Sequence, residues 1–397
     1  MGALTIEQVK AEAKIIHEEI IKIRRHLHMH PELSYQEKET SNFIKNVLDK
    51  YEIPYTAGWA EHGIVAYLDG ETNGRNRALR ADMDALPIQE AIDVPYKSKN
   101  PGVMHACGHD VHTSSLLGAA IITKRFRKYL AGTVYFIFQP GEEKLPGGAH
   151  LMIEQGVLDV IRPDFIIAQH VYPQLPAGIV GLKAGNYMAS ADEIYISVKG
   201  KGGHAALPQL SNDCVVAAAQ LITALQTIKS RNADPLTPMV LTIGKISSIG
   251  GATNIIPGEV KMEGTLRTMD EEWRSKAHSR IISLAKNIGE AFDCEIEVNI
   301  LKGMPCVYNN EQLTDKIRNF MKPYMGEECV VEIPARMTAE DFAYFSHRVP
   351  CCFYRLGTSN PQKSITSNIH TDTFDIDEDA LLIGAGLMAW LALKVEI

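Results

Sequence analysis

Thr133-Val-Tyr-Phe-Ile-Phe-Gln-Pro-Gly-Glu-Glu143 is the stretch that decides the fold class of this 397-residue chain. Its apolar first half predicts a buried β-strand, and the turn residues that follow lead directly into two carboxylates. Three other apolar runs end in polar residues in the same way: Arg77–Ala81 before Asp82-Met-Asp84, Phe165–Gln169 before His170, and Cys352–Leu356 before Gly357-Thr-Ser359. The repetition predicts one sheet whose strands end at a shared polar edge.

Helical patterns lie between these predicted strands. Residues 6–30 carry apolar side chains near helical spacing and end at Pro31, and helical patterns also cover Ser114–Tyr129 and Ala149–Gln155. Strands that alternate with helices are typical of an α/β fold with a central mixed, mostly parallel sheet. Ligands in such sheets bind beyond the carboxyl ends of the strands, so we expect the functional site among the polar residues named above.

The middle of the chain has a different pattern. Asp192–Lys199 alternates apolar and polar residues, as a half-buried strand does, and a glycine-rich turn follows it. The later segments are predicted as helix, strand, strand, helix and strand, at Cys214–Ile228, Val240–Ile246, Glu259–Thr268, Glu271–Phe292 and Glu295–Leu301. This βαββαβ order predicts a smaller α+β domain at 189–303, inserted into a larger domain made of 1–188 and 304–397.

Composition limits the class of protein. The chain is 45% hydrophobic, which suffices for large cores, and its length favours two domains. The net charge of −8 and the lack of a basic stripe argue against nucleic-acid binding. We expect no membrane span and no signal peptide, because no apolar run has the required form. Seven scattered cysteines do not suggest a disulfide framework, so we expect a cytoplasmic protein with free thiols.

The short run Met104–His112 holds one thiol and three imidazoles. A thiolate and a neutral imidazole both bind zinc-like metals, and a glycine between Cys107 and His109 lets both side chains face one point. A single buried cysteine is more often an inert apolar residue, but this density of groups favours metal binding. His105 and His112 are weaker candidates, which would either support a ligand or bond to nearby backbone.

Carboxylates and isolated histidines complete the set of candidates. Adjacent glutamates are most often part of a solvated loop, but Glu142 and Glu143 follow a predicted strand end. There, one can bind a metal while the other takes a proton from a water molecule. Asp82 and Asp84 would either cap a turn or orient a metal-bound imidazole. Two isolated histidines are each ambiguous alone. His170 follows a predicted strand, and His370 lies in a polar loop late in the chain.

One glycine pattern points to another class of protein. Gly200-x-Gly202-x-x-Ala205 formally fits a dinucleotide fingerprint, but no acidic residue closes a second strand about 20 residues later, as that motif requires. The hypothesis of a nucleotide-dependent oxidoreductase therefore rests on a weak match. The chain also has no Walker loop, serine nucleophile elbow or HExxH motif.

Six motifs taken together resemble one family. They are similar to those of the bacterial and plant amidohydrolases in the aminoacylase/carboxypeptidase metallohydrolase superfamily, which include hippurate hydrolases, N-acetyl-amino-acid deacetylases and auxin-conjugate hydrolases. The motifs are Arg80–Pro87, Met104–Asp110, Gln139–Glu143, Gly202–Ala205, Asn254–Gly258 and Met337–Phe342. The resemblance extends from about Arg24 to the C-terminus, and the ordered set is more specific than any single motif.

The resemblance implies a dinuclear centre of two divalent metal ions, of the kind Zn, Mn, Co or Ni, on the larger domain. Five residues match the family's metal ligands: Cys107, His109, Glu143, His170 and His370. Glu142 matches the general base, and Asp84 matches the aspartate that orients a ligand. In the peptidase branch a histidine ligand stands at the position of Asp82, so the cysteine-containing pattern of this chain favours the amidohydrolase branch.

The resemblance also implies roles for the inserted domain. His204 matches the histidine that stabilises the oxyanion, often from the partner subunit. Asn254 and Arg267 match contacts to a substrate carboxylate, which the planar guanidinium of an arginine binds well. The inserted domain would act as a lid over the substrate and would form the interface of a homodimer or tetramer.

We therefore expect an enzyme, an amidohydrolase that splits the amide bond of a small N-acyl amino acid such as an acetyl or benzoyl derivative. Glu142 would take a proton from a metal-activated water. The alternative on the same scaffold is a dipeptidase or carboxypeptidase. A non-catalytic binding protein is a third hypothesis, but a binder has no use for a general base. The sequence leaves the acyl group, the amino acid and the physiological metal open.

Overall fold

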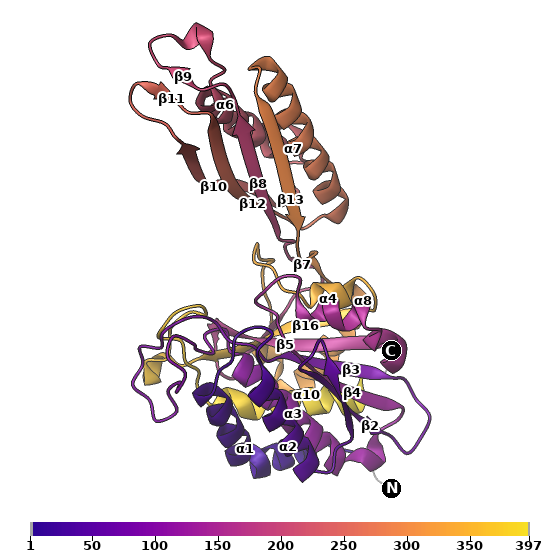
Figure 1. The fold of residues 1–397 in the computed structure, drawn as a ribbon. Helices are drawn as coiled ribbons and strands as arrows, with labels where there is room; N and C mark the ends of the chain where they lie inside the picture. The colour runs from indigo at the N-terminus through magenta and orange to yellow at the C-terminus, as the bar shows by residue number, and fades with distance from the viewer. Residues whose placement is uncertain (1–2, 396–397) are drawn as a thin grey trace. The chain divides into compact units, whose positions relative to one another are not determined.

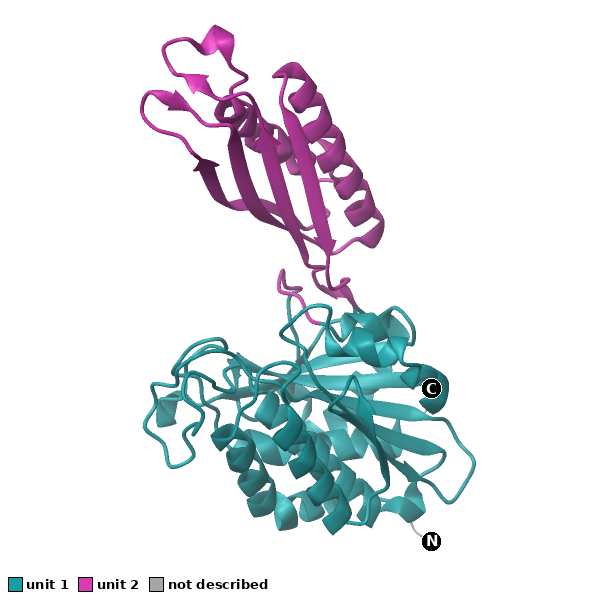
Figure 2. Ribbon diagram, viewed as in Figure 1, with its two compact units in different colours: residues 1–185, 308–334, 341–397 teal, residues 186–307, 335–340 magenta. Residues whose placement is uncertain are grey.

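The structure is a computed structural model that describes residues 3–395. It divides into two compact units, which Figure 2 distinguishes by colour. Unit 1 contains the chain up to Gly185, residues 308–334 and the chain from Asp341 onward, and unit 2 contains residues 186–307 and 335–340. Unit 1 is therefore discontinuous, because three separate stretches of sequence build it.

The unit boundaries differ from the predicted ones at 188/189 and 303/304. The main difference is the segment 335–340, which the sequence placed in the larger domain and which belongs to unit 2. Backbone hydrogen bonds explain this assignment, because the Ala189 N–H donates to the carbonyl oxygens of Arg336 and Thr338, each at 3.1 Å. A contact between residues so far apart in the chain leaves no local signal in the sequence.

Unit 1 is built on one eight-stranded sheet (Figure 1). Its strands, in order across the sheet, are β1 (Tyr55–Trp59), β2 (Gly63–Asp69), β4 (Thr133–Gln139), β3 (Arg77–Asp82), β5 (Phe165–Pro176), β16 (Cys351–Ser359), β6 (Val180–Leu182) and β15 (Val330–Glu332). The central strands β4, β3, β5 and β16 are parallel to one another, whereas β1 and β2 join antiparallel. The predicted mixed, mostly parallel sheet is confirmed.

Helices cover this sheet. α1 (Ile6–Met29), α3 (His109–Arg125) and α10 (Asp379–Lys394) pack together and share one apolar core with its strands (Figure 1). Nearly every side chain of α3 and α10 is buried, as expected of helices that are apolar on all sides. The other helices of unit 1 are α2 (Lys38–Lys50), α4 (Gly148–Glu154), α5 (Val157–Ile161), α8 (Glu311–Met325) and α9 (Ala343–Ser346).

Two details at the polar edge differ from the prediction. β5 runs on to Pro176 because it stays paired with β16 as far as Ser359, so His170 lies within a strand and not after one. α3 begins at His109, earlier than the predicted Ser114. The residue before it, Gly108, has φ +80°, a conformation that glycine adopts without strain, and the turn there starts the helix early.

Unit 2 contains a four-stranded antiparallel sheet. Its strands, in order across the sheet, are β10 (Met239–Ile249), β12 (Glu259–Thr268), β8 (Asp192–Lys199) and β13 (Glu295–Lys302). Two helices, α6 (Cys214–Thr227) and α7 (Glu271–Ala291), complete the βαββαβ order, so this prediction is also confirmed (Figure 1). Of the remaining short strands, β9 (Gly203–His204) and β11 (Ile255–Ile256) lie in unit 2, whereas β7 (Gly185–Met188) and β14 (Val307–Asn309) span the boundaries between the units.

The core of unit 2 follows from the alternation in β8. Ile194, Ile196 and Val198 point to one face because successive side chains of a strand alternate, and all three are buried there against α6 and α7. The other face of the sheet carries polar and partly exposed side chains. One layer of helices on one face of a sheet is therefore enough to build this small core.

Candidate metal centre

The ends of β3 and β4 place acidic residues at one edge of the large sheet. The two strands are parallel neighbours, with Asp82 opposite Gln139. The chain beyond each strand therefore leaves the sheet at the same edge. This brings the two acidic segments into contact, because the Glu143 N–H donates to Asp84 Oδ2 at 2.9 Å.

Two loops bring a sulfur and an imidazole to the same edge. Cys107 stands before α3, and His370 lies in the loop between β16 and α10. The His370 N–H donates to the Ala106 carbonyl at 2.7 Å and so ties the two loops together. His370 has φ +62°, a left-handed conformation that is strained for a non-glycine residue and that this hydrogen bond helps to hold.

All five predicted metal ligands lie together in unit 1. Cys107 Sγ is 3.5 Å from His170 Nε2 and 3.3 Å from His370 Nε2. Glu143 Oε1 is 3.3 Å from His370 Nε2 and 3.9 Å from His109 Nε2. The donor atoms form two overlapping groups, each with all atoms within 4.8 Å of one another: Cys107, His109 and His170, and Cys107, Glu143 and His370.

Hydrogen bonds on the outer side of two imidazoles set which nitrogen faces the cluster. His109 Nδ1 lies 3.0 Å from Asp84 Oδ1, and His170 Nδ1 lies 2.8 Å from the Val171 carbonyl oxygen. Both oxygens are acceptors, so Nδ1 must be the protonated nitrogen in each ring. When the ring is neutral, the lone pair on Nε2 therefore points toward the cluster, which is the arrangement that metal-binding histidines commonly have.

Unsatisfied atoms lie at the centre of the cluster. His109 Nε2 and Glu143 Oε1 are buried without a hydrogen-bond partner among the described residues, which is costly unless another group satisfies them. A set of one sulfur, three imidazole nitrogens and one carboxylate suits Zn²⁺ and similar ions. The His370 side chain is 52% exposed, so the cluster is open to solvent on that side, unlike a closed structural zinc site. The residues present fit an open metal centre.

The charges around the cluster also favour a cation. Burial raises the pKa of the Cys107 thiol well above its ordinary value, and the carboxylates of Glu143 and Glu142 raise it further. Burial opposes a charge on His109, but Asp82 and Asp84 outweigh it and raise the pKa of His109 to about 10. These carboxylates are crowded into one buried space, so a positive ion among them would stabilise them all.

His112 supports this cluster without offering it a free nitrogen. Its Nε2 accepts the Val171 N–H at 2.9 Å, so its Nδ1 carries the proton and donates to Asp82 Oδ1 at 2.5 Å. Asp82 also accepts from Arg80 Nη1 at 2.7 Å. Of the two roles open to His112 from the sequence, support of the site and bonding to backbone, the structure shows both.

Glu142 lies beside the candidate ligands. It is 7% exposed, and its Oε1 accepts the Asp341 N–H at 3.3 Å. Asp341 belongs to the motif Met337–Phe342, and its carboxylate is held by one side chain from β3 and one from β4. Oxygen atoms of Glu142 and Glu143 and a nitrogen of His109 lie within 4.8 Å of one another. The Glu142 carboxylate can therefore reach a molecule bound at the cluster.

The three predicted substrate contacts lie in unit 2. His204 on β9 and Asn254 beside β11 are neighbours, because these short strands pair. His204 Nδ1 accepts a nearby backbone N–H at 3.1 Å, so Nε2 is the protonated and exposed nitrogen. Arg267 lies near the other end of β12, where its Nη1 donates to two backbone carbonyls. The structure thus groups His204 with Asn254 and not with Arg267.

Sequence reasoning missed a layer of charged residues behind the ligands. Arg24 of α1 is fully buried, and it donates from Nε to Asp110 at 2.8 Å and from Nη2 to Asp375 at 2.9 Å. The two aspartates lie in the first turn of α3 and in the loop before α10, close in sequence to candidate ligands. Arg24 itself was a usable signal, because a charge on the apolar face of a helix needs a buried partner.

Comparison with known proteins identifies the family. The model of the family described as Peptidase family M20/M25/M40 matches residues 78–394. The N-acetyl-L-cysteine deacetylase of Bacillus subtilis (strain 168) is 42% identical over 369 residues, which cover 92% of this chain and 86% of that protein. This chain belongs to peptidase family M20/M25/M40.

Two further similar proteins extend the comparison. Thermostable carboxypeptidase 2 of Saccharolobus solfataricus is 38% identical over 392 residues, which cover 98% of each chain. The crystal structure of the Bacillus subtilis YXEP protein, described as a dinuclear metal binding peptidase from the M20 family, has a TM-score of 0.83 and 34% identity. That match covers 96% of this chain and 98% of the other. The region matched by the M20/M25/M40 model contains every predicted site residue, from Asp84 to His370, but it leaves out α1 and α2.

Proposed function

We propose that this protein hydrolyses the amide bond of a small N-acyl amino acid, with two divalent metal ions bound in unit 1. One observation carries the proposal, namely the convergence of five donor side chains: Cys107, His109, Glu143, His170 and His370. The likeness to an N-acetyl-L-cysteine deacetylase supports the substrate class. The likeness to a dinuclear metal binding peptidase supports two metal ions, for which Zn, Mn, Co and Ni are the candidates.

The residues then divide the chemistry between them. Bound metal ions would supply an acidified water molecule and a polarised amide carbonyl. Glu142 takes one proton from the attacking water and later gives it to the nitrogen of the leaving amine, as the C–N bond breaks. Asp84 holds Nδ1 of His109 and so keeps Nε2 directed at the cluster. The products are a carboxylic acid and a free amino acid.

Residues of unit 2 supply substrate contacts in this proposal. His204 donates from Nε2 to the carbonyl oxygen as negative charge develops on it. Asn254 and Arg267 lie toward opposite ends of β12, so the carboxylate of the substrate would meet Arg267 of one copy of the chain and Asn254, with His204, of a second copy. Since Nη1 of Arg267 is already engaged by backbone carbonyls, its Nε and Nη2 would make this contact.

The alternative is a carboxypeptidase or dipeptidase on the same centre, which the likeness to thermostable carboxypeptidase 2 favours. The two activities differ in the group on the acyl side of the scissile bond, because the leaving amino acid is the same in both. N-acetyl-L-methionine, hippurate and an unblocked dipeptide should therefore be compared with one metal at a time. We expect faster turnover of the blocked substrates, and preference for the free dipeptide would support the alternative.

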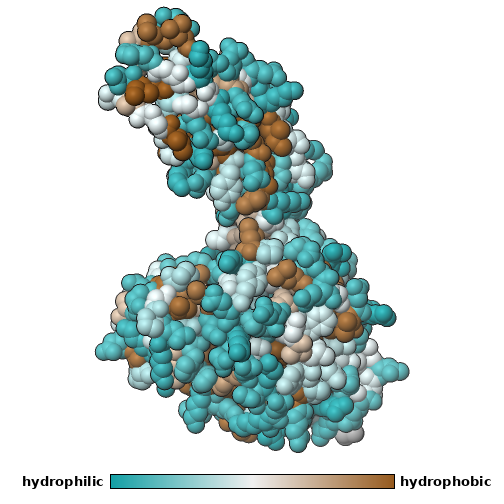
Figure 3. Space-filling model, viewed as in Figure 1, coloured by the Kyte–Doolittle hydropathy of each residue, from teal (hydrophilic) through white to brown (hydrophobic). Residues whose placement is uncertain are grey.

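We further propose that unit 1 is the catalytic domain and that unit 2 is a lid that joins two copies into a homodimer, or four into a tetramer. β10 is an edge strand of its sheet, and its side chains Val240, Ile246 and Ile249 are 39%, 53% and 48% exposed. Figure 3 shows apolar surface on this part of unit 2 and on the tip that carries β9 and β11. An exposed apolar strand edge is a surface suited to pairing with a second copy.

A cytoplasmic location is proposed as well. All seven cysteines lie within the described residues and are free thiols, as in a reducing compartment. In the part of the chain that the structure describes, no helix has both the length and the hydropathy to cross a membrane. Fractionation of the native host, with activity followed across the fractions, checks the location.

The two adjacent glutamates give the sharpest test of the mechanism. Glu142→Gln should keep its metal content and lose on the order of 10²–10⁴-fold in kcat, because a general base is removed. Glu143→Gln should lose metal, because a ligand is removed. Metal analysis and kcat for each variant, measured with N-acetyl-L-methionine, separate the two roles.

A chelator provides the control for both variants. Removal of metal from the wild-type enzyme should abolish turnover, and added Zn²⁺, Mn²⁺ or Co²⁺ should restore it. Turnover that survives complete removal of metal would rule out the metal-dependent mechanism. Full activity in Glu142→Gln would rule out this residue as the base.

A further inference from the structure

The segment that joins α1 to α2, Glu32–Glu37, lies against the candidate centre and outside the region that matches the family model. This segment is called the connector below. Its central residue, Tyr35, has φ +65°, a left-handed conformation that is unfavourable for a bulky residue. Such strain persists only where the surrounding contacts hold it, so the contacts of the connector indicate what it does.

One end of the connector holds Asp84. The Ala85 N–H donates to the Glu32 carbonyl at 2.8 Å, and Ser34 Oγ donates to Asp84 Oδ2 at 2.6 Å. The other oxygen of Asp84 is the one that meets His109 Nδ1. Ser34 therefore fixes the rotation of the Asp84 carboxylate, so that one oxygen remains for the ligand.

The rest of the connector holds the loop that carries Glu142 and Glu143. Before this pair, the Gly141 N–H donates to Glu37 Oε1 at 2.7 Å. After it, Tyr35 Oη donates to the carbonyl of Lys144 at 2.7 Å and accepts the N–H of Gly147 at 3.0 Å. Burial raises the pKa of Tyr35 to about 12, so its hydroxyl keeps the proton that it donates. The connector thus grips the loop on both sides of the glutamates.

Close packing adds to these hydrogen bonds. Gly141 has φ +62°, and a Cβ atom at this position would come within 2.3 Å of the Tyr35 ring. The ring therefore lies directly on the backbone of the loop. The loop cannot move toward the connector, and the hydrogen bonds prevent it from moving away.

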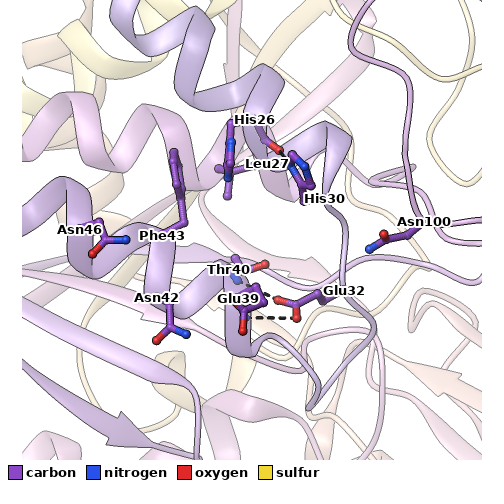
Figure 4. Close-up of a pocket in the computed structure, with 10 residues that line it drawn as sticks. All are labelled: His26, Leu27, His30, Glu32, Glu39, Thr40, Asn42, Phe43, Asn46 and Asn100. Carbon is purple, nitrogen blue, oxygen red and sulfur yellow. Dashed lines mark hydrogen bonds between the residues drawn. The ribbon is translucent and has the colours of Figure 1, made fainter.

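The connector is itself anchored to α2. The Glu32 carboxylate accepts the N–H groups of Glu39 at 3.2 Å and Thr40 at 2.8 Å, in the first turn of that helix (Figure 4). These N–H groups have no partner within the helix, so the carboxylate caps it. Glu32 lies on the wall of a pocket of about 390 Å³ between α1 and α2, whereas Glu37 is fully buried. The connector is therefore held to a helix on one side and to the loop on the other.

We propose that Ser34, Tyr35 and Glu37 are positioning residues, which hold Asp84 and the Glu142–Glu143 loop in the geometry that hydrolysis needs. The inference rests on the proposed function, in which Glu142 is the base and Glu143 a ligand. None of the three residues meets the substrate. Their effect is to hold this loop from the side of the connector, in addition to the contacts that Glu143 makes with Asp84 and Glu142 makes with Asp341.

Tyr35→Phe tests the inference with the least disturbance, because it removes one hydroxyl and keeps the ring. Glu37→Ala removes the acceptor for Gly141, whereas Glu37→Gln keeps an oxygen there. A displaced base costs rate, so kcat should fall on the order of 10–100-fold in Tyr35→Phe and Glu37→Ala, with KM nearly unchanged. The acidic limb of the kcat pH profile should shift in both variants, and Glu37→Gln should recover most of the wild-type kcat.

Glu39→Gln is the matched control, since this glutamate is exposed and its carboxylate has no partner among the described residues. It should behave as wild type. Unchanged kcat and pH profile in both Tyr35→Phe and Glu37→Ala would overturn the inference, and so would a loss of rate that metal loss or unfolding fully accounts for. Glu142→Gln, assayed in parallel, separates the proposed base role of Glu142 from the positioning role of the connector. If Glu142→Gln is fully active, the assignment of the base fails. If Glu142→Gln is inactive and the connector variants are fully active, only the role of the connector is refuted.

Discussion

Glu37 is a buried carboxyl group, and its ionised form destabilises the folded state. Burial raises the pKa of Glu37 to about 7 from an ordinary 4.5, and the nearby Asp84 carboxylate adds to the effect. The folded state therefore holds this proton more tightly than the unfolded state does. The contribution of protonated Glu37 to folding stability is fully present below pH 4.5 and is lost as the pH rises through 7. Glu37→Gln, which cannot ionise, should gain up to about 3 kcal/mol relative to wild type between pH 4 and pH 8.

Urea unfolding of the two proteins at several pH values measures this difference. The exposed Glu39→Gln should show the pH dependence of the wild type, because its carboxylate is solvated in both states. A wild-type curve parallel to that of Glu37→Gln would show that Glu37 is not protonated in the folded protein near neutral pH.

Residue types and spacing pointed to Cys107 and His109 but left His170 and His370 ambiguous. The resemblance to the amidohydrolases implied the full set of five donors, and the structure brings these five side chains together. Spacing alone did not show why His170 is a candidate ligand and His112 is not, although both lie at the polar edge. Their difference is the Val171 peptide, whose N–H binds Nε2 of His112 and whose carbonyl binds Nδ1 of His170. This peptide group orients His170 toward the cluster and occupies the free nitrogen of His112. The spacing of residues in the sequence does not reveal such a contact.

At the scale of elements, α1 supports the centre from behind through Arg24. Arg24→Met would remove the guanidinium that pairs with buried Asp110, leave it only the His28 imidazole, and should cost about 3–5 kcal/mol of stability. Burial opposes a charge on both groups, but their mutual attraction keeps the pKa of Asp110 far below its ordinary value. Chemical unfolding of the metal-loaded protein measures the loss.

Arg25→Met is the matched control on the same helix. Its side chain is 42% exposed and pairs with Glu378 near the surface, so its removal should cost less than about 1 kcal/mol. The double variant Arg24→Met, Asp110→Asn should lose less stability than the two single variants together, because it removes both charges. Equal losses for Arg24→Met and Arg25→Met would contradict the buried pair.

Elements with a clear period were the most predictable from sequence. β8 and β12 have the predicted bounds, Asp192–Lys199 and Glu259–Thr268, because alternation and flanking turns define them locally. β5 exceeds its prediction because its length depends on pairing with β16, far away in the chain. The connector was also missed, since Ser34, Tyr35 and Glu37 contact residues 50–112 positions later. The length of β5 and the contacts of the connector therefore depend on partners far away in the sequence, which the local pattern of residues does not reveal.

For the whole molecule, the edge of β10 predicts how copies associate. Ile246→Lys places a charge on this exposed apolar edge and should shift the protein from dimer toward monomer. Light scattering after size-exclusion chromatography measures the mass. The change should disturb little of the fold, because the replaced side chain is already half in solvent.

Ile282→Lys on α7 is the control, because Ile282 is 53% exposed, as Ile246 is, but lies on the helical layer. It should leave the mass unchanged. A monomeric wild-type protein would refute the proposed dimer, and a dimer that resists Ile246→Lys would place the interface elsewhere.

The discontinuity of unit 1 also has a consequence during translation. β16 lies between β5 and β6 in the sheet, although the ribosome makes it after all of unit 2. The strands of unit 2 can pair as they emerge, whereas the large sheet of the nascent chain keeps a gap until residue 359 has been made. Four of the five candidate metal ligands are made before unit 2, whereas His370 and the core helix α10 follow it. The complete set of ligands therefore exists only after the last stretch of unit 1 has been made.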